Sequence, residues 1–282
     1  MTETNALRPP VGIVVPTVDN SFFSSLSAAA NRFLLDAGYT PLILSSGNSA
    51  ETEKQHLRAL AALGVRGILC VSGLGAWPDD LLPESLPLVW VDRRPESKRV
   101  IPFVANDDCA AMSEAAEYLI EKGCRNILLM PGYLAENRIS PRVVGYEAAL
   151  KKHGITPDPA NILYRSGQKP SEIESEELIR QAMARNVQAD AVITSSDRAA
   201  FGVITALHRV GLYVPEDVRL ISFDNSPYSR MASPAVSALD RRPDLLAEKA
   251  CGCLLDRIAG KPVPPETIIP VSIIRRDRKS VV

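Results

Sequence analysis

Short apolar runs separated by helical patterns organise this chain. Eight runs of β-branched and aliphatic residues are continuous instead of alternating with polar residues, which is typical of strands covered on both faces. These predicted strands cover residues 11–15, 41–44, 67–71, 87–91, 126–130, 162–164, 191–194 and 218–223. Another apolar run near the end, 267–274, predicts one further strand.

Apolar residues recur at helical spacing between these runs. One stripe extends from Phe22 to Ala37 and is followed by Gly38, a residue type that commonly ends helices. Regular alternation of strand and helix predicts an α/β fold with parallel sheets and right-handed crossovers, either closed into a barrel or divided into two doubly wound lobes. A late helix over 244–259 and the strand after it favour two lobes joined by a hinge that the chain crosses several times.

Composition narrows the class of protein. The chain has 282 residues, 46% of them hydrophobic, and a formal net charge of −1 at pH 7. These values are typical of a soluble globular protein and differ from the basic composition of nucleic-acid-binding domains. No apolar run approaches the roughly 20 residues that span a bilayer. Residues 1–10 do not have the charged and apolar regions of a secretory signal, so we expect a cytoplasmic protein.

Motifs for catalysis, metals and cofactors are missing from the sequence. It contains no phosphate-binding loop, nucleophile elbow or zinc-protease motif. Gly73 and Gly75 begin like a dinucleotide fingerprint, but Pro78 occupies the place of its third glycine. Cys251 and Cys253 are close in sequence, yet on a helix this spacing points the thiols to different faces. We therefore expect reduced cysteines, no metal site, no cofactor and no catalytic residues.

The loop after the first predicted strand has the composition of a ligand-binding loop. Residues 16–23 join a buried strand to the start of a helix, and open α/β sheets bind ligands at such strand ends. Asp19, Phe22 and Phe23 lie in this loop and are candidate ligand contacts, because aromatic faces suit sugar C–H surfaces or a planar base. Phe22 can equally begin the apolar stripe of the helix, and the pattern does not decide between these roles.

Several segments resemble successive signatures of the LacI/GalR family of bacterial transcription regulators. They are VGIVVPTVDNSFF, GVRGIL, PLVWVDRR, YLIEKGCRNILLMPG, PRVVGYEAAL, the run ADAVITSSDRAAFGVITALHRVGLYVPEDVRLISFDN, and LLDRIAGK. The resemblance extends over about 11–276, nearly the whole chain. Its most specific part is residues 189–225, where DRAAFG, GLYVPEDV and FDN follow one another.

The resemblance implies two Rossmann-like lobes of the periplasmic-binding-protein type, with three hinge crossovers and an effector cleft between the lobes. We expect residues 1–10 to be a remnant linker. The N-terminal lobe would comprise 11–122 and 243–262, and the C-terminal lobe 123–239 and 265–282. Relatives grip operator DNA as dimers through a helix-turn-helix head. Only ten residues precede Val11, so we expect the DNA-binding head to be absent from this chain.

The resemblance also implies effector-binding residues. Arg142 in the R-x-x-G-Y motif matches the effector-contacting arginine of the family, and Asp224 in F-D-N matches a ligand carboxylate. Relatives usually carry Asn-Asp where this chain has Ser196 and Asp197, and a hydroxyl lacks the paired donor and acceptor of an amide. Arg242 aligns with a position that is often Gln and faces the cleft.

Three weaker candidates lie at predicted loops or helix starts, namely Arg93, Asp107 and Lys169. The positively charged residues among all the candidate effector-binding residues favour an anionic ligand such as a sugar phosphate or sugar acid. Charges at loop ends are, however, usually just solvated.

These features together predict the sensing core of a LacI/GalR-type repressor. It would bind a small sugar-like effector and, as a homodimer, shift operator affinity allosterically. The alternative is a solute-binding protein of a sugar transport system, which shares the fold but normally carries a signal peptide. A third possibility, an α/β enzyme, would need a nucleophile–base pair or a cofactor loop, and the sequence shows neither.

Overall fold

The computed structural model describes residues 8–133 and 140–276. They divide into two compact units, the first comprising residues up to 106 with 242–269, and the second 107–241 with the residues from 270 onward. The chain therefore passes between the units at three points, after Asn106, Arg241 and Ile269. Three crossovers are the number that the family resemblance predicted.

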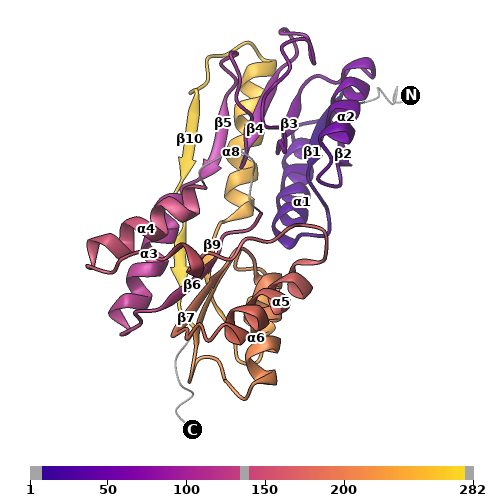
Figure 1. The fold of residues 1–282 in the computed structure, drawn as a ribbon. Coiled ribbons are helices and arrows are strands. Elements are labelled where there is room, and N and C mark those ends of the chain that lie inside the picture. The colour runs from indigo at the N-terminus through magenta and orange to yellow at the C-terminus, as the bar shows by residue number, and fades with distance from the viewer. Residues whose placement is uncertain (1–7, 134–139, 277–282) are drawn as a thin grey trace. The chain divides into compact units, whose positions relative to one another are not determined.

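The first unit contains a six-stranded parallel sheet (Figure 1). Its strands are β1 (Pro10–Val15), β2 (Thr40–Ser45), β3 (Ile68–Cys70), β4 (Leu88–Val91), β5 (Phe103–Asn106) and β10 (Glu266–Ile269). They lie in the order β10-β5-β4-β3-β1-β2. Because all six strands run in one direction, their carboxyl ends lie along a single edge of this sheet.

Helices cover both faces of this sheet. They are α1 (Ser21–Asp36), α2 (Ala50–Ala62) and α8 (Pro243–Ile258). One core cluster joins α1 and α8 to alternate strand residues such as Ile13 and Leu69, and the opposite cluster joins α2 to Val14 and Cys70. Burial on both faces explains why these strands read as continuous apolar runs.

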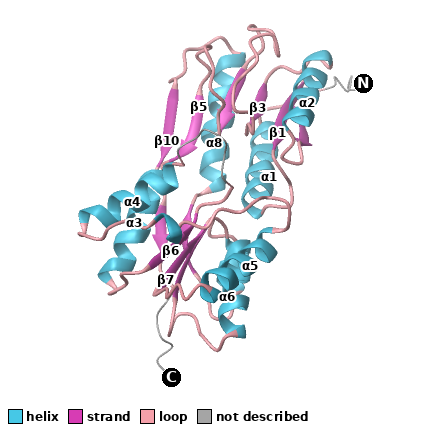
Figure 2. Cartoon of the chain, in the orientation of Figure 1, coloured by secondary structure: helices cyan, strands magenta, loops and turns pink. Residues whose placement is uncertain are grey.

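The second unit contains a five-stranded sheet in the order β11-β9-β8-β7-β6. Figure 2 draws its strands in magenta and labels β6 and β7. The strands are β6 (Ile127–Met130), β7 (Ala191–Thr194), β8 (Arg219–Phe223), β9 (Ser237–Asp240) and β11 (Ser272–Ile274). The first four are parallel, and β11 pairs antiparallel with β9. The carboxyl ends of β6 to β9 thus share one edge.

Helices also cover both faces of the second sheet. They are α3 (Asp108–Glu121), α4 (Pro141–Lys152), α5 (Ser171–Ala184), α6 (Asp197–Arg209) and the short α7 (Pro227–Met231), with a 3-10 turn at Pro159–Asn161. The helices α3 and α4 pack on one face, and α5 and α6 on the other.

Two glycines permit close packing within these helix pairs. A Cβ atom at Gly145 would lie 2.0 Å from the carbonyl oxygen of Cys109, and one at Gly202 would lie 2.0 Å from that of Glu172. Any larger residue would push apart α3 and α4, or α5 and α6. Gly145 belongs to the R-x-x-G-Y motif, so part of that motif has a packing role.

Most predicted strands are confirmed within one or two residues, and residues 191–194 match without a shift. The prediction at 162–164 is wrong, because this segment forms only an isolated bridge from Ile162 to Leu129. Two short strands, β5 and β9, were missed. The run 267–274 is two strands in different sheets, β10 and β11, rather than one.

The unit boundaries differ from the predicted lobes at two places. We expected residues 107–122 in the first lobe, but α3 packs against α4 and the second sheet. We expected residues 265–269 in the second lobe, but β10 pairs with β5 in the first sheet. Both segments adjoin a crossover, where sequence periodicity carries no information about which core receives a helix or strand.

Candidate functional site

The carboxyl ends of β6 to β9 carry the densest group of buried polar side chains in the second unit. Buried here are Arg165, Ser195, Ser196, Asp197, Asp224, Ser226 and Arg241, each at most 8% exposed. Polar groups at this edge of a parallel sheet are the usual means by which α/β proteins hold small ligands. The edge is therefore the candidate functional site of this unit.

Arg142 lies in the first turn of α4 and makes several contacts at this edge. Its Nε donates to the Asp108 carboxylate at 2.9 Å, and its Nη1 donates to the carbonyl oxygens of Pro131 and Ser195 at 3.4 and 3.3 Å. Its side chain is 15% exposed. The guanidinium is thus held in one orientation while part of it remains accessible.

Asp108 and Arg241 extend this contact into a charged chain. The Arg241 Nε lies 3.9 Å from Asp108, and its Nη1 lies 3.6 Å from Asp224. The side chains of Arg241 and Asp224 are only 4% and 3% exposed. We call Arg142, Asp108, Arg241 and Asp224 the arginine–carboxylate network. Its two guanidiniums and two carboxylates balance in charge.

An aromatic ring lies against both arginines of the network. The guanidinium carbon of Arg142 is 3.9 Å from the centroid of the Phe223 ring, and that of Arg241 is 5.7 Å away. Phe223 ends β8 and is fully buried. Cation–π contact with a rigid ring stabilises the positions of both guanidiniums.

Ser196 and Asp197 have roles within the protein. Ser196 is the N-cap of α6, and its hydroxyl accepts from the Ala199 N–H at 3.2 Å. The Asp197 carboxylate accepts from the Ser222 hydroxyl and from the Ser226 N–H. Burial raises the pKa of Asp197, and the hydrogen bonds from Ser222 and Ser226 oppose that rise. Asp197 therefore fixes the turn that follows β8.

That turn has an unusual backbone. Asp224 and Asn225 have φ angles of +100° and +53°, in the region that few residues other than glycine adopt. Arg276 donates to the Asn225 side chain, to Ser229 and to the Val236 carbonyl. Strained residues of this kind gather at binding sites and persist where their surroundings hold them. The surroundings here are Asp197 on one side and Arg276 on the other.

Arg165 follows the segment that runs beside β6. Its backbone N–H donates to the Gly132 carbonyl, and its Nη2 donates to the Ser195 hydroxyl at 3.3 Å. Its guanidinium carbon lies 4.7 Å from the centroid of the Tyr133 ring. Arg142 and Arg165 thus both contact Ser195, one at the backbone oxygen and the other at the side chain. Arg165 is 8% exposed.

The corresponding edge of the first unit has a different composition. Glu53, in α2, is 1% exposed and accepts from the Ser72 hydroxyl at 2.6 Å and from the Gly73 N–H at 2.8 Å. Burial raises the pKa of Glu53, which the hydrogen bonds from Ser72 and Gly73 only partly offset. This carboxyl group therefore positions the loop that follows β3.

The predicted ligand residues of the first unit lie near the same edge. Phe22 and Phe23 are 2% and 4% exposed and belong to the core cluster beneath α1, with ring centroids 5.3 Å apart. That placement favours the structural alternative for Phe22. The Arg93 guanidinium lies 5.2 Å from the Phe23 ring centroid, and its Nε lies 3.5 Å from Asp92. Asp19 is exposed.

Three other predicted residues lie outside the arginine–carboxylate network. Asp107 is the N-cap of α3 and accepts from the Ala110 N–H at 2.9 Å. Lys169 precedes α5 and pairs with Glu177 of that helix at 2.7 Å, where both side chains are partly exposed. Arg242 is exposed, with a φ angle of +48° at the start of α8. The structure thus brings Arg142 and Asp224 together and assigns these three to other surroundings.

Sequence reasoning missed Asp108 and Arg241 by one residue each. Asp108 precedes Met112, Ala115 and Leu119 at helical spacing, so it lies on the same face of α3 as these buried residues. Arg241 follows the end of β9 and comes two residues after Leu239, so the alternation of the strand, continued by one residue, places both on the same face. The choice of Asp107 and Arg242 ignored these periodicities. No comparable periodicity in the sequence pointed to Arg165 or Glu53.

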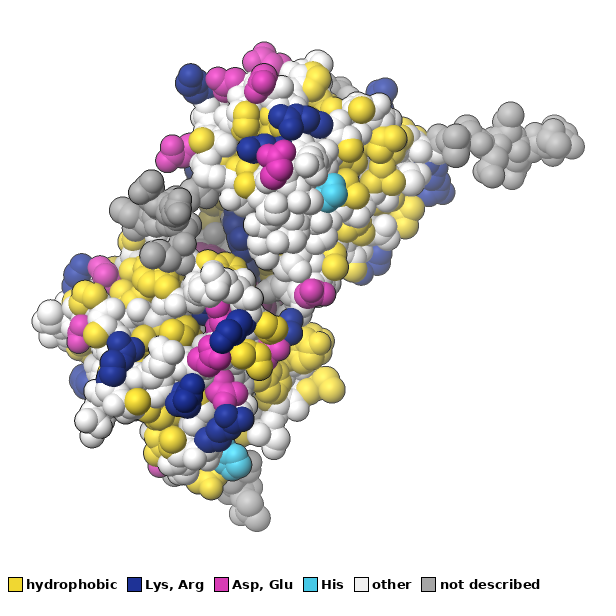
Figure 3. Space-filling view, turned by 45° about the vertical axis from the view of Figure 1, so that its right-hand side comes forward, with side chains coloured by type: hydrophobic (Ala, Val, Ile, Leu, Met, Phe, Trp, Pro, Cys, Tyr) yellow, Lys and Arg dark blue, Asp and Glu magenta, His cyan; other side chains and the backbone are white. Residues whose placement is uncertain are grey.

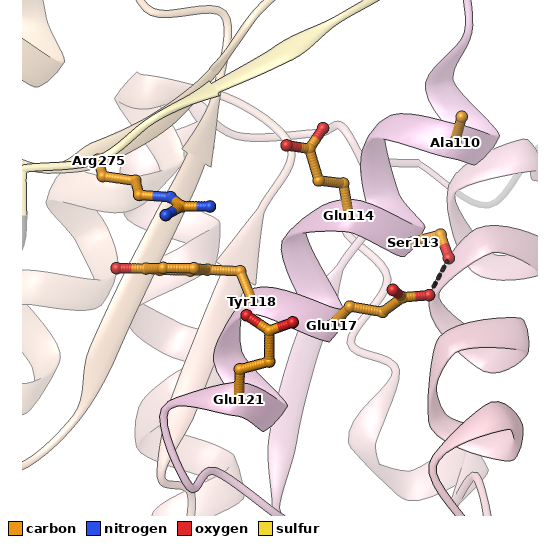
Figure 4. Close-up of a pocket in the computed structure, with 7 residues that line it drawn as sticks. All are labelled: Ala110, Ser113, Glu114, Glu117, Tyr118, Glu121 and Arg275. Carbon is orange, nitrogen blue, oxygen red and sulfur yellow. Dashed lines mark hydrogen bonds between the residues drawn. The ribbon is translucent and has the colours of Figure 1, made fainter.

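A separate pocket lies on the surface of the second unit (Figure 4). Its volume is about 350 Å³, and Glu114, Glu117 and Glu121 of α3 contribute to its wall. The Arg275 guanidinium covers the Tyr118 ring, with its central carbon 4.6 Å from the ring centroid. None of the predicted effector-binding residues lines this pocket.

The surface charges are mixed. On the face drawn in Figure 3, basic and acidic side chains are interspersed rather than gathered by sign.

Within residues 8–133 and 140–276, no helix is both long and apolar enough to cross a membrane.

Comparison with known proteins identifies the family. The model of the periplasmic binding protein-like domain matches residues 116–280. The HTH-type transcriptional repressor PurR of Yersinia pestis bv. Antiqua (strain Antiqua) is 30% identical over 263 residues, which cover 92% of this chain and 76% of that protein.

Solved structures agree with this relationship. The transcriptional repressor AscG of Escherichia coli is 26% identical, with a TM-score of 0.79 and coverage of 95% of this chain and 98% of that chain. The transcription regulator CcpA of Lactococcus lactis shares the fold at 23% identity, with a TM-score of 0.82 and coverage of 96% and 99%. These relatives are regulators rather than transport proteins or enzymes. The chain belongs to the LacI/GalR family of transcriptional regulators and corresponds to its periplasmic-binding-protein-like, effector-binding core.

Proposed function

We propose that the arginine–carboxylate network at the carboxyl ends of β6 to β9 binds the effector of this regulator. The observation that carries the proposal is the position of Arg142, whose guanidinium is fixed by Asp108, Pro131 and Ser195 and is still 15% exposed. A preorganised planar donor of this kind binds sugar hydroxyls, carboxylates or phosphates with little loss of side-chain entropy.

Asp224 supplies the complementary chemistry. A carboxylate accepts hydrogen bonds from two neighbouring hydroxyl groups, so Arg142 as donor and Asp224 as acceptor suit a sugar or sugar derivative. Ser196 replaces the amide that relatives usually carry, and its hydroxyl already caps α6. We therefore expect the ligand to differ from the sugars that such an amide selects.

The proposed mechanism is a shift of population between two conformations of the regulator. An effector changes operator affinity only to the extent that it binds one conformation more tightly than the other. We propose that DNA contact is made by a helix-turn-helix region of the kind named for the Yersinia relative. No step in this mechanism requires catalysis, and we expect the regulator to act in the cytoplasm.

A homodimer is part of the proposal, and exposed apolar side chains support it. Met231 and Tyr228 of α7 are 81% and 54% exposed, and Phe201 of α6 packs its ring edge-on against Tyr228. Exposed apolar patches of this kind often mark association surfaces. We expect light scattering to give a dimer mass, and a dimer weakened by Met231→Lys. A monomer mass at about 100 μM protein would contradict this part of the proposal.

A thermal-shift screen tests the binding site. The probes are neutral sugars, sugar acids, sugar phosphates and purines, and a ligand that binds the folded state raises its stability by roughly RT ln(1 + [L]/Kd). We expect one class to raise the melting temperature of the wild-type chain. Arg142→Met and Asp224→Asn should abolish that rise, whereas Lys151→Met, an exposed cation of α4, should preserve it. A shift that survives both site substitutions would overturn the proposed site.

A further inference from the structure

Arg165 differs from the other arginines at this edge of the second unit. Arg142 and Arg241 lie beside the carboxylates of Asp108 and Asp224, and Arg276 donates to Asn225, Ser229 and Val236. Among the described residues, Arg165 has one hydrogen bond from its side chain, to the Ser195 hydroxyl, and its guanidinium stacks on the Tyr133 ring.

The remaining donors of this guanidinium have no acceptor in the part of the chain that the structure describes. Both Nε and Nη1 of Arg165 are buried and without a hydrogen-bond partner among those residues. A guanidinium does not lose its proton in proteins, so the charge and the unsatisfied donors remain. Burial of an ionised group without an anion is costly, and an unsatisfied group of this kind in a native protein calls for a functional explanation.

The negative charge of Glu174 does not supply the missing acceptor. Glu174 lies within electrostatic reach of Arg165, but its carboxylate already accepts from the Ser166 hydroxyl and the Gly167 N–H. Burial raises the pKa of Glu174, yet these hydrogen bonds and the charge of Arg165 outweigh burial, so the pKa lies below its ordinary value. Glu174 therefore stays ionised while the Nε and Nη1 hydrogens keep no acceptor.

We infer that the effector carries a carboxylate or phosphate group, and that Arg165, with the Ser195 hydroxyl beside it, selects that group. This inference rests on the proposed function. An oxyanion supplies what Arg165 lacks, namely several acceptor lone pairs and a negative charge, whereas a neutral hydroxyl supplies only an acceptor. Charge-assisted hydrogen bonds to such groups are about twice as strong as neutral ones. Ser195 links this position to Arg142, which contacts the backbone of the same residue.

The first test needs no ligand. Arg165→Met preserves much of the side-chain volume and removes the buried charge, so we expect its melting temperature to equal or exceed that of the wild type. Arg142→Met should melt lower, because it leaves Asp108 without its 2.9 Å partner. A fall for Arg165→Met as large as that for Arg142→Met would show that Arg165 serves the fold, and would overturn the inference.

The second test compares matched probes: D-glucose, D-gluconate, D-glucose 6-phosphate, inorganic phosphate and hypoxanthine. We expect an anionic probe to bind the wild type and its Kd to rise about 10- to 100-fold in Arg165→Met, the range for a lost charged hydrogen bond. Lys151→Met, which removes one exposed positive charge, is the control and should leave the Kd unchanged.

The other outcomes separate the two proposals. Equal binding of glucose or hypoxanthine by the wild type and Arg165→Met would sustain the proposed function and overturn the anionic effector. Binding of an anion with the same Kd in both proteins would also overturn the role of Arg165. If no probe of any class binds the folded wild-type chain, both the inference and the proposed function are contradicted.

Discussion

The carboxyl edges of the two sheets differ in how they hold charge. In the first unit, the buried acid Glu53 is held by neutral partners, the Ser72 hydroxyl and the Gly73 N–H. In the second unit, guanidiniums and carboxylates contact one another directly in the arginine–carboxylate network. The neutral partners of Glu53 hold a loop in place. The charged groups of the network can in addition replace a contact with one another by a contact with a ligand. This difference supports our proposal that the second unit recognises the polar groups of the ligand.

The local fold explains this difference. The chain enters the second unit at the N-terminus of α3, which places Asp108 in the first turn of that helix, and α4 begins with Pro141 and Arg142. Both helices pack on the face of the sheet that holds Phe223. In the first unit, the loop after β1 leads into α1 with Phe22 and Phe23 buried in the core. The edge of the second unit thus receives charged side chains from two helix starts, whereas the helix start after β1 buries aromatic side chains in the core of the first unit.

Asp224→Asn should have the largest effect on stability. It removes the charge that faces Arg241 while keeping a residue type that tolerates a positive φ angle. Breaking a buried ion pair costs about 3 kcal/mol, because the remaining charge has lost its counterpart. Urea denaturation monitored by circular dichroism measures this change. The exposed pair Arg32–Asp244 is the control, and Asp244→Asn should cost less than about 0.5 kcal/mol. Equal costs would remove the contrast between buried and exposed charge.

Glu53→Ala should have a smaller effect in the first unit. It leaves the Ser72 hydroxyl and the Gly73 N–H without their acceptor, at a cost of about 2 kcal/mol in the free energy of unfolding. Glu53→Gln keeps one acceptor oxygen and removes the buried charge, so it should cost less than Glu53→Ala. If Glu53→Gln were the more damaging variant, the charge itself would matter, and the contrast with the second unit would be wrong.

The pH dependence should be opposite for Glu53 and Glu174. The pKa of Glu53 is raised above its ordinary value of 4.5, so the folded protein holds that proton more tightly than the unfolded chain, and its contribution to stability falls as the pH rises above 4.5. The pKa of Glu174 is lowered, so its contribution is present above 4.5 and is lost as the pH falls through the lowered value. Unfolding of the wild type, Glu53→Gln and Glu174→Gln between pH 3 and 7 measures both trends. If the contributions of Glu53 and Glu174 to stability changed with pH in the same direction, the opposite pKa shifts of the two groups would be contradicted.

Lys169→Met should have the smallest effect. Its partner Glu177 is 2.7 Å away, but the two side chains are 53% and 36% exposed, so solvent screens the pair. We expect a change below about 0.5 kcal/mol in stability and no change in ligand affinity. Loss of binding in this variant would return Lys169 to the site that the sequence first suggested.

The sequence was informative where periodicity determines structure. The strands β1 and β7 are apolar on both faces, and their runs predicted them closely. The strands β5 and β9 have only four residues each, FVAN and SALD. Such short segments, which mix apolar and polar residues, cannot be distinguished from loops by their sequence. The run 267–274 reads as continuous, yet its two halves pair with different sheets, which only tertiary structure decides.

The site shows the same limit. Arg142 and Asp224 lie in recognisable motifs, and the structure joins them in one network through Asp108 and Arg241. Glu53 lies in a helix with several charged residues, and nothing local distinguishes it from exposed ones. Its burial depends on Ser72, nineteen residues away. Patterns along the sequence therefore could not predict contacts, such as this one, between residues that are far apart in the chain.

Calorimetric titration of the effector found by the screen, into the wild type, Arg142→Met and Glu53→Gln, tests the central claim most directly. The second unit's edge should carry the binding energy, so Arg142→Met should raise the Kd by about 10- to 100-fold. Glu53→Gln, at the edge of the first unit, should leave the Kd within about threefold, less than 1 kcal/mol. The reverse pattern, with binding lost in Glu53→Gln and kept in Arg142→Met, would contradict the assignment of recognition to the arginine–carboxylate network.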